Sequence, residues 1–340
     1  MYRKYPQSLF LVVFTVFLYL HLRYLIYSEH SYIQTRLYHV KAIKKEIQEG
    51  FGTKDMTKKM FERRNLIREV CSRIGEVNID KPWNFNGEDT QDFNVEQHIH
   101  PSNFLMDPLT KTLYCYVHKI GSSSLMNVYS YLDNNTDFLS DIKSGKKYLY
   151  EIHRRMNPSY SELMENLPDY YSFIVVRHPF ERLLSAFRDR IVMNPCSDAA
   201  VYTTKAIFGS KALNVSGCVA KVPSFRVFAQ YIIDRSDHEE LDKHWRPIYK
   251  LCSPCLINYD GIFRLNELNE LFHLTGISRK YFKKMPDLKN PTKGGTSSKH
   301  VNKFYSNLKC NMIKDLGRVY KLDMLLFGYN SKIYEQMCIS

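Results

Sequence analysis

The sequence lacks the marks of several protein classes. It contains no internal repeat and no low-complexity segment, which gives no support to a repeat architecture. No G-x-x-x-x-G-K-[ST] motif is present, which excludes that nucleoside-triphosphate signature. Apolar residues make up 44% and charged residues 24%, so the composition fits neither a disordered chain nor a polytopic membrane protein.

Acidic residues are the scarcer charged class. The 340 residues include 48 Lys and Arg against 35 Asp and Glu, which gives a net charge of +13. Such a chain attracts polyanions: nucleic acid, acidic lipid, acidic sugar polymers or a phosphorylated cofactor. The length favours two domains, or one large domain with an appendage.

An apolar run lies close to the N-terminus, at residues 9–27. At about 1.5 Å per residue it matches the ~30 Å hydrocarbon core of a bilayer, provided that Arg23 reaches the surface. We expect a signal-anchor transmembrane helix here, with a cytoplasmic tail at residues 1–8 because Arg3 and Lys4 precede it. A cleaved signal peptide is less favoured because no small residues follow the run. A buried globular helix is the third alternative.

Two features agree with a lumenal location for the rest of the chain. Asn134 and Asn214 each begin an Asn-x-Ser/Thr sequon and are candidate glycosylation sites. The eight cysteines are an even number that an oxidising compartment can pair. The motif Cys252-Ser-Pro-Cys255 is alternatively a zinc half-site or a redox pair, but no second close pair accompanies it, so disulfides are favoured.

We expect a lumenal stem at residues 28–110 and the main domain at residues 111–340. Within the stem, residues 36–73 contain eleven Lys or Arg and five Asp or Glu, with apolar residues at helical spacing. This pattern predicts a basic helical segment. Its charges form either a solvated face or a surface that binds a polyanion.

Two strand–loop–helix units follow in the main domain. Residues 113–117 are a short strand candidate, and residues 125–132 carry apolar side chains at helical spacing. Residues 171–176 are a second strand candidate, and Pro179 then suits the first turn of a helix. The pattern predicts an α/β fold with a parallel sheet flanked by helices, and ligands at the carboxyl ends of the strands.

The first loop, residues 118–124, has the chemistry of an anion site. Lys119 supplies a full charge, Gly121 lets the backbone approach a phosphate, and the following helix presents free N–H groups at its start. Three consecutive serines add hydroxyl donors. The simpler interpretation is a helix cap, since serine and glycine are common there.

The second loop adds further donors at the same edge of the sheet. Arg177 closes its strand, so its guanidinium is expected to lie close to Lys119. Ser185 and Arg188 follow on the helix, and a guanidinium and a hydroxyl together can hold a phosphate. Structural ion pairs are the alternative. These would join Arg177 or Arg182 to Glu181 or Asp189. Together, the two loops favour a nucleotide with two anionic groups.

These residues resemble a known family. Lys119-Ile-Gly-Ser-Ser-Ser resembles the 5′-phosphosulfate loop of Golgi carbohydrate sulfotransferases, and Arg177-His-Pro-Phe-Glu-Arg-Leu-Leu-Ser-Ala-Phe-Arg resembles their 3′-phosphate element. The block that begins at His244-Trp-Arg-Pro and the block from Tyr320 to Tyr329 are similar to the chondroitin and dermatan 4-O-sulfotransferase group. The similarity covers roughly residues 113–329.

The resemblance implies a type II Golgi enzyme that uses 3′-phosphoadenosine 5′-phosphosulfate on a P-loop-like α/β fold. The donor-binding positions it implies, with the residues argued above, are His118, Lys119, Ile120, Gly121, Ser122, Ser123, Ser124, Arg177, Ser185 and Arg188. The chain departs from the family pattern at His118 and His178, and at the serines 122–124, where the family usually has Cys-Thr-Asn. These departures bear on which sugar is sulfated.

Sulfuryl transfer should resemble phosphoryl transfer, in which the protein positions the reactants and neutralises charge. Lys119 is the candidate for stabilising charge on the sulfonate. A histidine, with an ordinary pKa of ~6.5, suits the role of general base. His153 is the first candidate because related hexuronic-acid 2-O-sulfotransferases place a histidine in that interval, and His244 is the second. A surface or core histidine is the alternative for both.

The expected function is sulfation of a glycan, at position 4 of N-acetylgalactosamine in chondroitin or dermatan. Alternatives are a hexuronic-acid 2-O-sulfotransferase, a glycoprotein or glycolipid sulfotransferase, and a membrane-anchored polyanion-binding protein without activity. We expect an acidic glycan as partner, no nucleic acid and no metal, and leave the oligomeric state open. Basic residues that could line a groove for the glycan are Arg154, Arg155, Lys205, Lys211, Lys221 and Arg246.

Overall fold

The computed structural model describes residues 54–74, 99–133, 135–146, 148, 150–235, 241–275, 277 and 298–339. The expected anchor at residues 9–27 and the sequon residue Asn134 lie outside the described residues. No helix within the described ranges is long and apolar enough to cross a bilayer.

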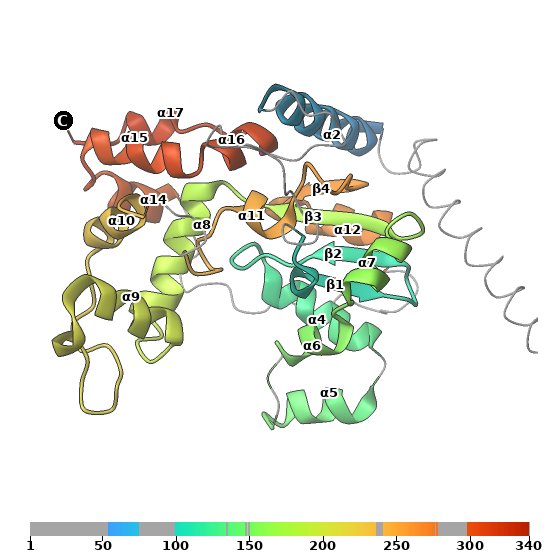
Figure 1. Ribbon diagram of the computed structural model, residues 1–340, viewed down its shortest axis with the longest axis horizontal. Coiled ribbons are helices and arrows are strands. Elements are labelled where there is room, and N and C mark those ends of the chain that lie inside the picture. Colours follow the sequence, from blue (N-terminus) through green and yellow to red (C-terminus); the bar gives the residue numbers. More distant parts are fainter. Residues whose placement is uncertain are drawn as a thin grey trace, which may run out of the picture. The chain divides into compact units, whose positions relative to one another are not determined.

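A four-stranded sheet forms the centre of one half of the described chain (Figure 1). Its strands lie in the order β1 (Phe104–Asp107), β2 (Thr112–Cys115), β3 (Tyr171–Val176) and β4 (Gly261–Arg264). The pairs β2–β3 and β3–β4 are parallel, whereas β1 is antiparallel to β2. The predicted α/β class is confirmed, but the sheet is mixed rather than wholly parallel. The connection between β1 and β2 is short, and a short connection reverses the chain direction.

The helices and short helical turns are, in chain order, α2 (Lys54–Ile74), η1 (Pro101–Asn103), α4 (Ser122–Leu132), α5 (Thr136–Lys143), α6 (Glu151–Met156), α7 (Tyr160–Asn166), α8 (Pro179–Ala186), η2 (Phe187–Val192), α9 (Asp198–Phe208), η3 (Ser210–Ala212), α10 (Phe225–Ile233), α11 (Ile248–Cys252), η5 (Leu265–Glu267), α12 (Leu268–Leu274), α14 (Ser298–Tyr305), α15 (Cys310–Val319), α16 (Lys321–Phe327) and α17 (Lys332–Glu335). Helix α6 packs on the edge strand β1, and α2 and α12 pack on the opposite edge strand β4. Both predicted strands and both following helices are present, with the first helix starting three residues earlier than expected.

Helix α2 belongs to the folded body, although sequence analysis placed it in the stem. Met60 and Ile67 are buried on its inner face, and the helix packs against β4 and α16. Arg63 donates to both carboxylate oxygens of Glu267, at 2.6 and 2.7 Å, and to the carbonyl of Ile262 at 2.8 Å. Part of the basic segment is therefore neither a free solvated face nor an available polyanion surface.

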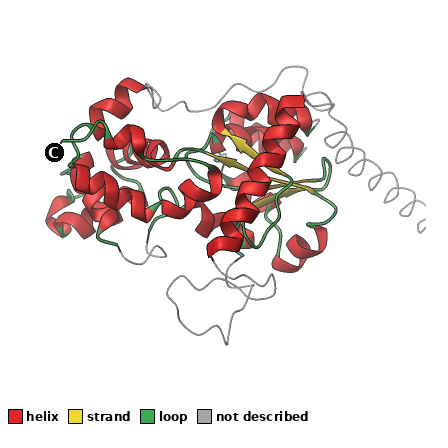
Figure 2. Ribbon diagram, turned by 90° about the horizontal axis from the view of Figure 1, so that it is seen from above, coloured by secondary structure: helices red, strands yellow, loops and turns green. Residues whose placement is uncertain are grey.

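A second, helical part lies beside the sheet and contains no named strand among the described residues (Figure 2). Its core contains the aromatic side chains of Phe180, Phe228, Trp245 and Tyr305, all at most 1% exposed. Helix α8 contributes Phe180 to this core and follows directly after β3, so it joins the sheet to the helical part.

All eight cysteines are paired, as Cys71–Cys255, Cys115–Cys252, Cys196–Cys218 and Cys310–Cys338. The preference for disulfides is confirmed. The two cysteines of the Cys-Ser-Pro-Cys motif join different partners, so the motif is neither a redox pair nor a zinc half-site. Disulfides of this number are typical of oxidising compartments.

Candidate functional site

The first loop makes a sharp turn between β2 and α4. Lys119 and Gly121 both have left-handed backbone angles, with φ of 69° and 82°. A side chain at Gly121 would place its Cβ 2.9 Å from Leu265 Cδ1, so only glycine fits without movement. The turn brings Lys119 to the start of α4, an eleven-residue helix whose N-terminus carries partial positive charge.

Lys119 has a carboxylate partner in this structure. Its Nζ lies 2.9 Å from Asp189 Oδ2 on the π-helix η2, and the side chain is 15% exposed. Burial lowers the pKa of Lys119, and Asp189 opposes that shift. The ion pair of Asp189 with Arg177 or Arg182, which the sequence allowed, is not found among the described residues; its described ion-pair partners are Lys119 and Arg190. An anionic ligand at the loop would compete with Asp189 for the ammonium group.

The second loop contacts the first directly. Arg177 Nη1 donates to the carbonyl of Lys119 at 3.1 Å, while its Nε lies 3.3 Å from Glu181 Oε2. Burial lowers the pKa of Arg177, an effect that Glu181 counters. The two loops thus share one edge of the sheet, as the parallel-strand argument predicts. The ion pair with Glu181 also exists, so the structural alternative holds for Arg177.

Helix α8 positions the other second-loop residues. His178 is its N-cap: Nδ1 accepts from the Phe180 N–H at 3.2 Å, and Nε2 lies 2.9 Å from the carbonyl of Asn330. Ser185 is 3% exposed on this helix, and no hydrogen bond among the described residues joins it to Arg177. Arg188 lies one residue into η2 and is half-buried. His178 therefore has a structural role here, and Ser185 and Arg188 stay candidates.

Three histidines from different parts of the sequence form a chain of contacts: His153 with Tyr116, Tyr116 with His118, and His118 with His244. The hydroxyl of Tyr116 lies 3.2 Å from His118 Nδ1, and its ring centroid is 5.0 Å from that of His153. The rings of His118 and His244 are 4.1 Å apart. His244 Nδ1 lies 2.5 Å from Asp242 Oδ1. This contact orients the imidazole ring, so Nε2 is the ring nitrogen that can act on a substrate.

Burial disfavours the protonated form of all three imidazoles. Burial lowers the pKa of His153 to about 4 and holds that of His118 well below its ordinary value. Burial also lowers the pKa of His244, although Asp242 acts in the opposite direction. Positive charge on Lys243 adds to the effect at all three rings. A neutral imidazole can accept a proton, which is what a general base requires.

Arg182 links the first loop to the segment around His244, and sequence analysis gave it no such role. The residue is 1% exposed, and its guanidinium donates to three carbonyls: those of His118 at 2.9 Å, Arg246 at 2.7 Å and Lys243 at 3.0 Å. The ion pair with Glu181 or Asp189 that sequence analysis allowed is not found among the described residues. A fully buried arginine is rare unless paired, and here backbone carbonyls take the place of a carboxylate.

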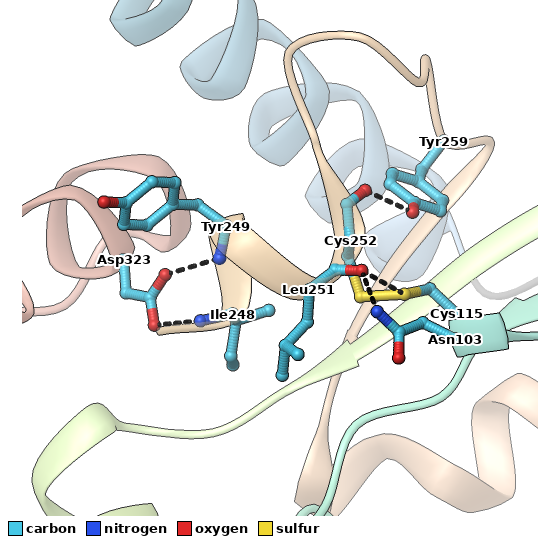
Figure 3. The surroundings of a disulfide bond; sticks show 8 residues. All are labelled: Asn103, Cys115, Ile248, Tyr249, Leu251, Cys252, Tyr259 and Asp323. Carbon is cyan, nitrogen blue, oxygen red and sulfur yellow. Dashed lines mark hydrogen bonds between the residues drawn. A yellow bond between two sulfur atoms is a disulfide. The ribbon is translucent and has the colours of Figure 1, made fainter. Parts of the chain in front are cut away.

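Asp323 holds the start of α11, which follows the His244 segment in the chain (Figure 3). Its buried carboxylate accepts from the N–H groups of Ile248 and Tyr249, at 2.7 and 2.9 Å, at the start of α11. The disulfide Cys115–Cys252 then ties the end of α11 to β2. Burial raises the pKa of Asp323 to about 6. Asp323 lies within the block from Tyr320 to Tyr329, but no local sequence pattern marks it as a residue with this role.

Two further residues that the sequence suggested as functional, Asn214 and Arg155, are exposed. Asn214 is exposed in a loop, where its Oδ1 accepts from the N–H groups of Ser216 at 3.0 Å and Cys218 at 2.9 Å. Arg155 pairs with Asp133 at 2.8 Å. No group of three or more His, Cys, Asp or Glu in the described part could hold a metal ion.

The comparisons with known proteins agree with this geometry. The profile of the sulfotransferase family matches residues 102–330, a span that contains both loops and all three histidines. The chain belongs to the sulfotransferase family. The predicted enzyme class is therefore confirmed. The match does not favour the alternative of a polyanion-binding protein without activity.

Several curated proteins are similar to this sulfotransferase. Carbohydrate sulfotransferase 11 of Rattus norvegicus is 29% identical over 245 residues, covering 68% of each chain. Carbohydrate sulfotransferase 8 of Homo sapiens is 26% identical over 297 residues, covering 84% of this chain and 67% of the relative. Carbohydrate sulfotransferase 14 of Danio rerio is 27% identical over 281 residues, covering 78% and 70%. No solved structure gives a significant match.

Proposed function

We propose that this sulfotransferase transfers sulfate from 3′-phosphoadenosine 5′-phosphosulfate to a sugar hydroxyl of a glycan, at position 4 of N-acetylgalactosamine in chondroitin or dermatan. The observation that carries the donor assignment is the contact between Arg177 and the carbonyl of Lys119, which joins two cationic loops at one sheet edge. The similar proteins are carbohydrate sulfotransferases, which supports a carbohydrate acceptor. The motif resemblance supports position 4.

The residues at this edge fit a donor with two anionic groups. In a P-loop-like arrangement, Lys119 and the loop to Ser124 would hold the 5′-phosphosulfate, and Arg177, Ser185 and Arg188 the 3′-phosphate. The donor supplies the sulfuryl group and leaves as an adenosine bisphosphate. Lys119 would leave Asp189 and neutralise the charge that develops on the sulfonate and its bridging oxygen.

We assign the general base to His244 rather than to His153, the first candidate from sequence. The bond from Nδ1 to Asp242 orients the ring, a feature typical of catalytic bases. His244 would take the proton of the acceptor hydroxyl at Nε2 while the hydroxyl oxygen forms its bond to sulfur. His153 lies against Tyr116, and its Nε2 is buried with no hydrogen-bond partner among the described residues.

The proposed location is the Golgi membrane, with the catalytic domain in the lumen. The four disulfides support an oxidising compartment, and the exposed Asn214 is accessible for glycosylation. The division into tail (1–8), anchor (9–27), stem (28–110) and catalytic domain (111–340) stays a proposal. Residues 104–107 of that stem supply β1, and the family profile starts at residue 102.

A sulfate-transfer assay tests the proposed function. The purified lumenal part is incubated with radiolabelled donor and a panel of desulfated glycosaminoglycans, and the products are digested to disaccharides. Label at position 4 of N-acetylgalactosamine is expected. Label on a hexuronic acid, or only on glycoprotein or glycolipid ends, would support the alternative acceptors, and no label in any glycan would contradict the proposal.

A further inference from the structure

A cavity opens beside the proposed base, apart from the donor-binding loops. Its volume is about 410 Å³, within the ~300–1,000 Å³ typical of ligand pockets. Three segments line it: the approach to β1, helix α9 and the segment that precedes and forms α11. The lining residues are His100, Ser102, Asn103, Tyr202, Leu241, Asp242, Lys243, Arg246 and Leu251. No residue of the first loop, nor Arg177, belongs to this lining.

The cavity is tied to the proposed reaction centre through Asp242. Asp242 lines the cavity, and its Oδ1 lies 2.5 Å from Nδ1 of His244, which is not itself a lining residue. Lys243 also lines the cavity, and its positive charge contributes to the lowered pKa of His118, His153 and His244. A molecule in the cavity would therefore be separated from the proposed base by the side chain of Asp242.

The lining suits an acidic sugar. Tyr202 is 59% exposed, a large ring that offers an apolar face and a polar tip to a sugar. Arg246 and Lys243 provide two positive charges, and a guanidinium matches a carboxylate in shape. Arg246 Nε donates to the carbonyl of Leu241 at 2.9 Å, which holds the side chain beside the cavity. Ser102 and Asn103 add groups that can bind sugar hydroxyls.

We propose that this cavity is the acceptor subsite, in which Arg246 and Lys243 bind the carboxylate of a hexuronic acid and Tyr202 stacks on a sugar ring. The proposal rests on the proposed function. It adds where the acceptor binds and that the bound part of the acceptor is negatively charged. The hydroxyl to be sulfated would then reach His244 from the acceptor side, while the donor occupies the two loops. Of the basic residues that sequence analysis offered for a glycan groove, Arg246 lines this cavity.

The test compares variants on two matched acceptors: desulfated chondroitin and the same polymer with its carboxylates reduced to alcohols. The variants are Arg246→Gln, Tyr202→Ala and Tyr202→Phe. Tyr148→Ala is the control because Tyr148 is also a largely exposed tyrosine, at 67%, and lies outside the cavity lining. The backbone carbonyl of Arg246 that Arg182 binds is retained in Arg246→Gln. Circular dichroism and affinity for 3′,5′-adenosine bisphosphate report on the fold and the donor site.

We expect Arg246→Gln to raise the KM for desulfated chondroitin about tenfold, the factor of a lost charged hydrogen bond, and to change the KM for the reduced polymer little. Tyr202→Ala should raise both KM values, whereas Tyr202→Phe and Tyr148→Ala should keep those of the parent. Bisphosphate affinity should stay constant throughout. Unchanged KM values in both Arg246→Gln and Tyr202→Ala would overturn the cavity as acceptor subsite.

A binding measurement separates failure of this proposal from failure of the proposed function. If the parent sulfates no glycan, the proposed function fails, and calorimetry with a desulfated chondroitin hexasaccharide still tests the cavity. Binding that Arg246→Gln and Tyr202→Ala weaken would support the subsite. Absence of binding to the parent, or binding that both variants retain, would overturn it.

Discussion

The guanidinium of Arg177 donates to the backbone carbonyl of Lys119 at 3.1 Å, across 58 residues of sequence. This contact joins the two loops that we assign to the donor. Because it uses a backbone carbonyl, it survives any substitution of the lysine side chain and is lost when Arg177 is replaced. The two positions can therefore be tested independently.

Replacing Arg177 should weaken binding of the bisphosphate product. Arg177→Ala removes a buried cation, and we expect a loss on the order of 1.5–3 kcal/mol in the affinity for 3′,5′-adenosine bisphosphate, measured by calorimetry. Adenosine 5′-phosphate, which lacks the 3′-phosphate, should lose much less. Arg318→Ala is the control because that arginine is 77% exposed on α15. Equal losses for both nucleotides would contradict a 3′-phosphate role.

The two histidine candidates predict opposite results. With His244 as base, His244→Ala should lower kcat about 10²–10⁴-fold while bisphosphate affinity stays unchanged. His153→Ala should have a much smaller effect on kcat. Steady-state kinetics at saturating donor and acceptor measure both. If His153→Ala abolishes turnover and His244→Ala does not, the base is His153.

The pH dependence of turnover gives a second criterion. Burial lowers the pKa of His244, so the acid limb of kcat should lie below the ordinary value of ~6.5. Asp242 raises that pKa, so Asp242→Asn should move the acid limb to lower pH and also reduce kcat, because the ring loses its orientation. A limb at about pH 4 that Asp242→Asn leaves in place would instead indicate His153.

Arg182 should be important for stability because it donates to three part-buried carbonyls. Arg182→Met leaves the carbonyls of His118, Lys243 and Arg246 without this donor, and an unsatisfied group costs about 1–3 kcal/mol when it is shielded from water. We expect a loss of at least ~3 kcal/mol in the free energy of unfolding, measured with denaturant under non-reducing conditions. A loss as small as that of Arg318→Ala would show that the contacts contribute little.

Asp323 should make the free energy of unfolding fall as pH rises, which is the opposite of the usual effect of a carboxylate. Its pKa in the folded state, about 6, is above its ordinary value of 3.8, so folding favours the protonated form. Its contribution is fully present below the unfolded pKa and declines as pH rises through about 6. Asp323→Asn should remove this dependence, so the difference in unfolding free energy between parent and variant should change by on the order of 2–3 kcal/mol between pH 4 and 7.5. A constant difference would refute the assignment.

Local patterns in the sequence were sufficient for the two strand–loop–helix units. A buried strand, a glycine turn and a helix start each depend on residues within a few positions of one another, so residues 171–176 and Pro179 predicted β3 and α8 with the observed bounds at the strand and the helix start. The convergence of Lys119 and Arg177 followed from strand direction alone. The resemblance of these loops identified the enzyme class that the family profile shows.

Contacts between distant segments were decided by the tertiary structure. The antiparallel β1, the packing of α2 on the sheet and the four cysteine pairs depend on which surfaces meet, and no local pattern specifies that. Arg182 and Asp323 look like ordinary charged residues in sequence, and only burial shows that their partners are backbone groups of another segment. The same holds for the histidines: Tyr116 contacts His118 and His153, and His118 in turn contacts His244, although the three histidines lie far apart in the sequence.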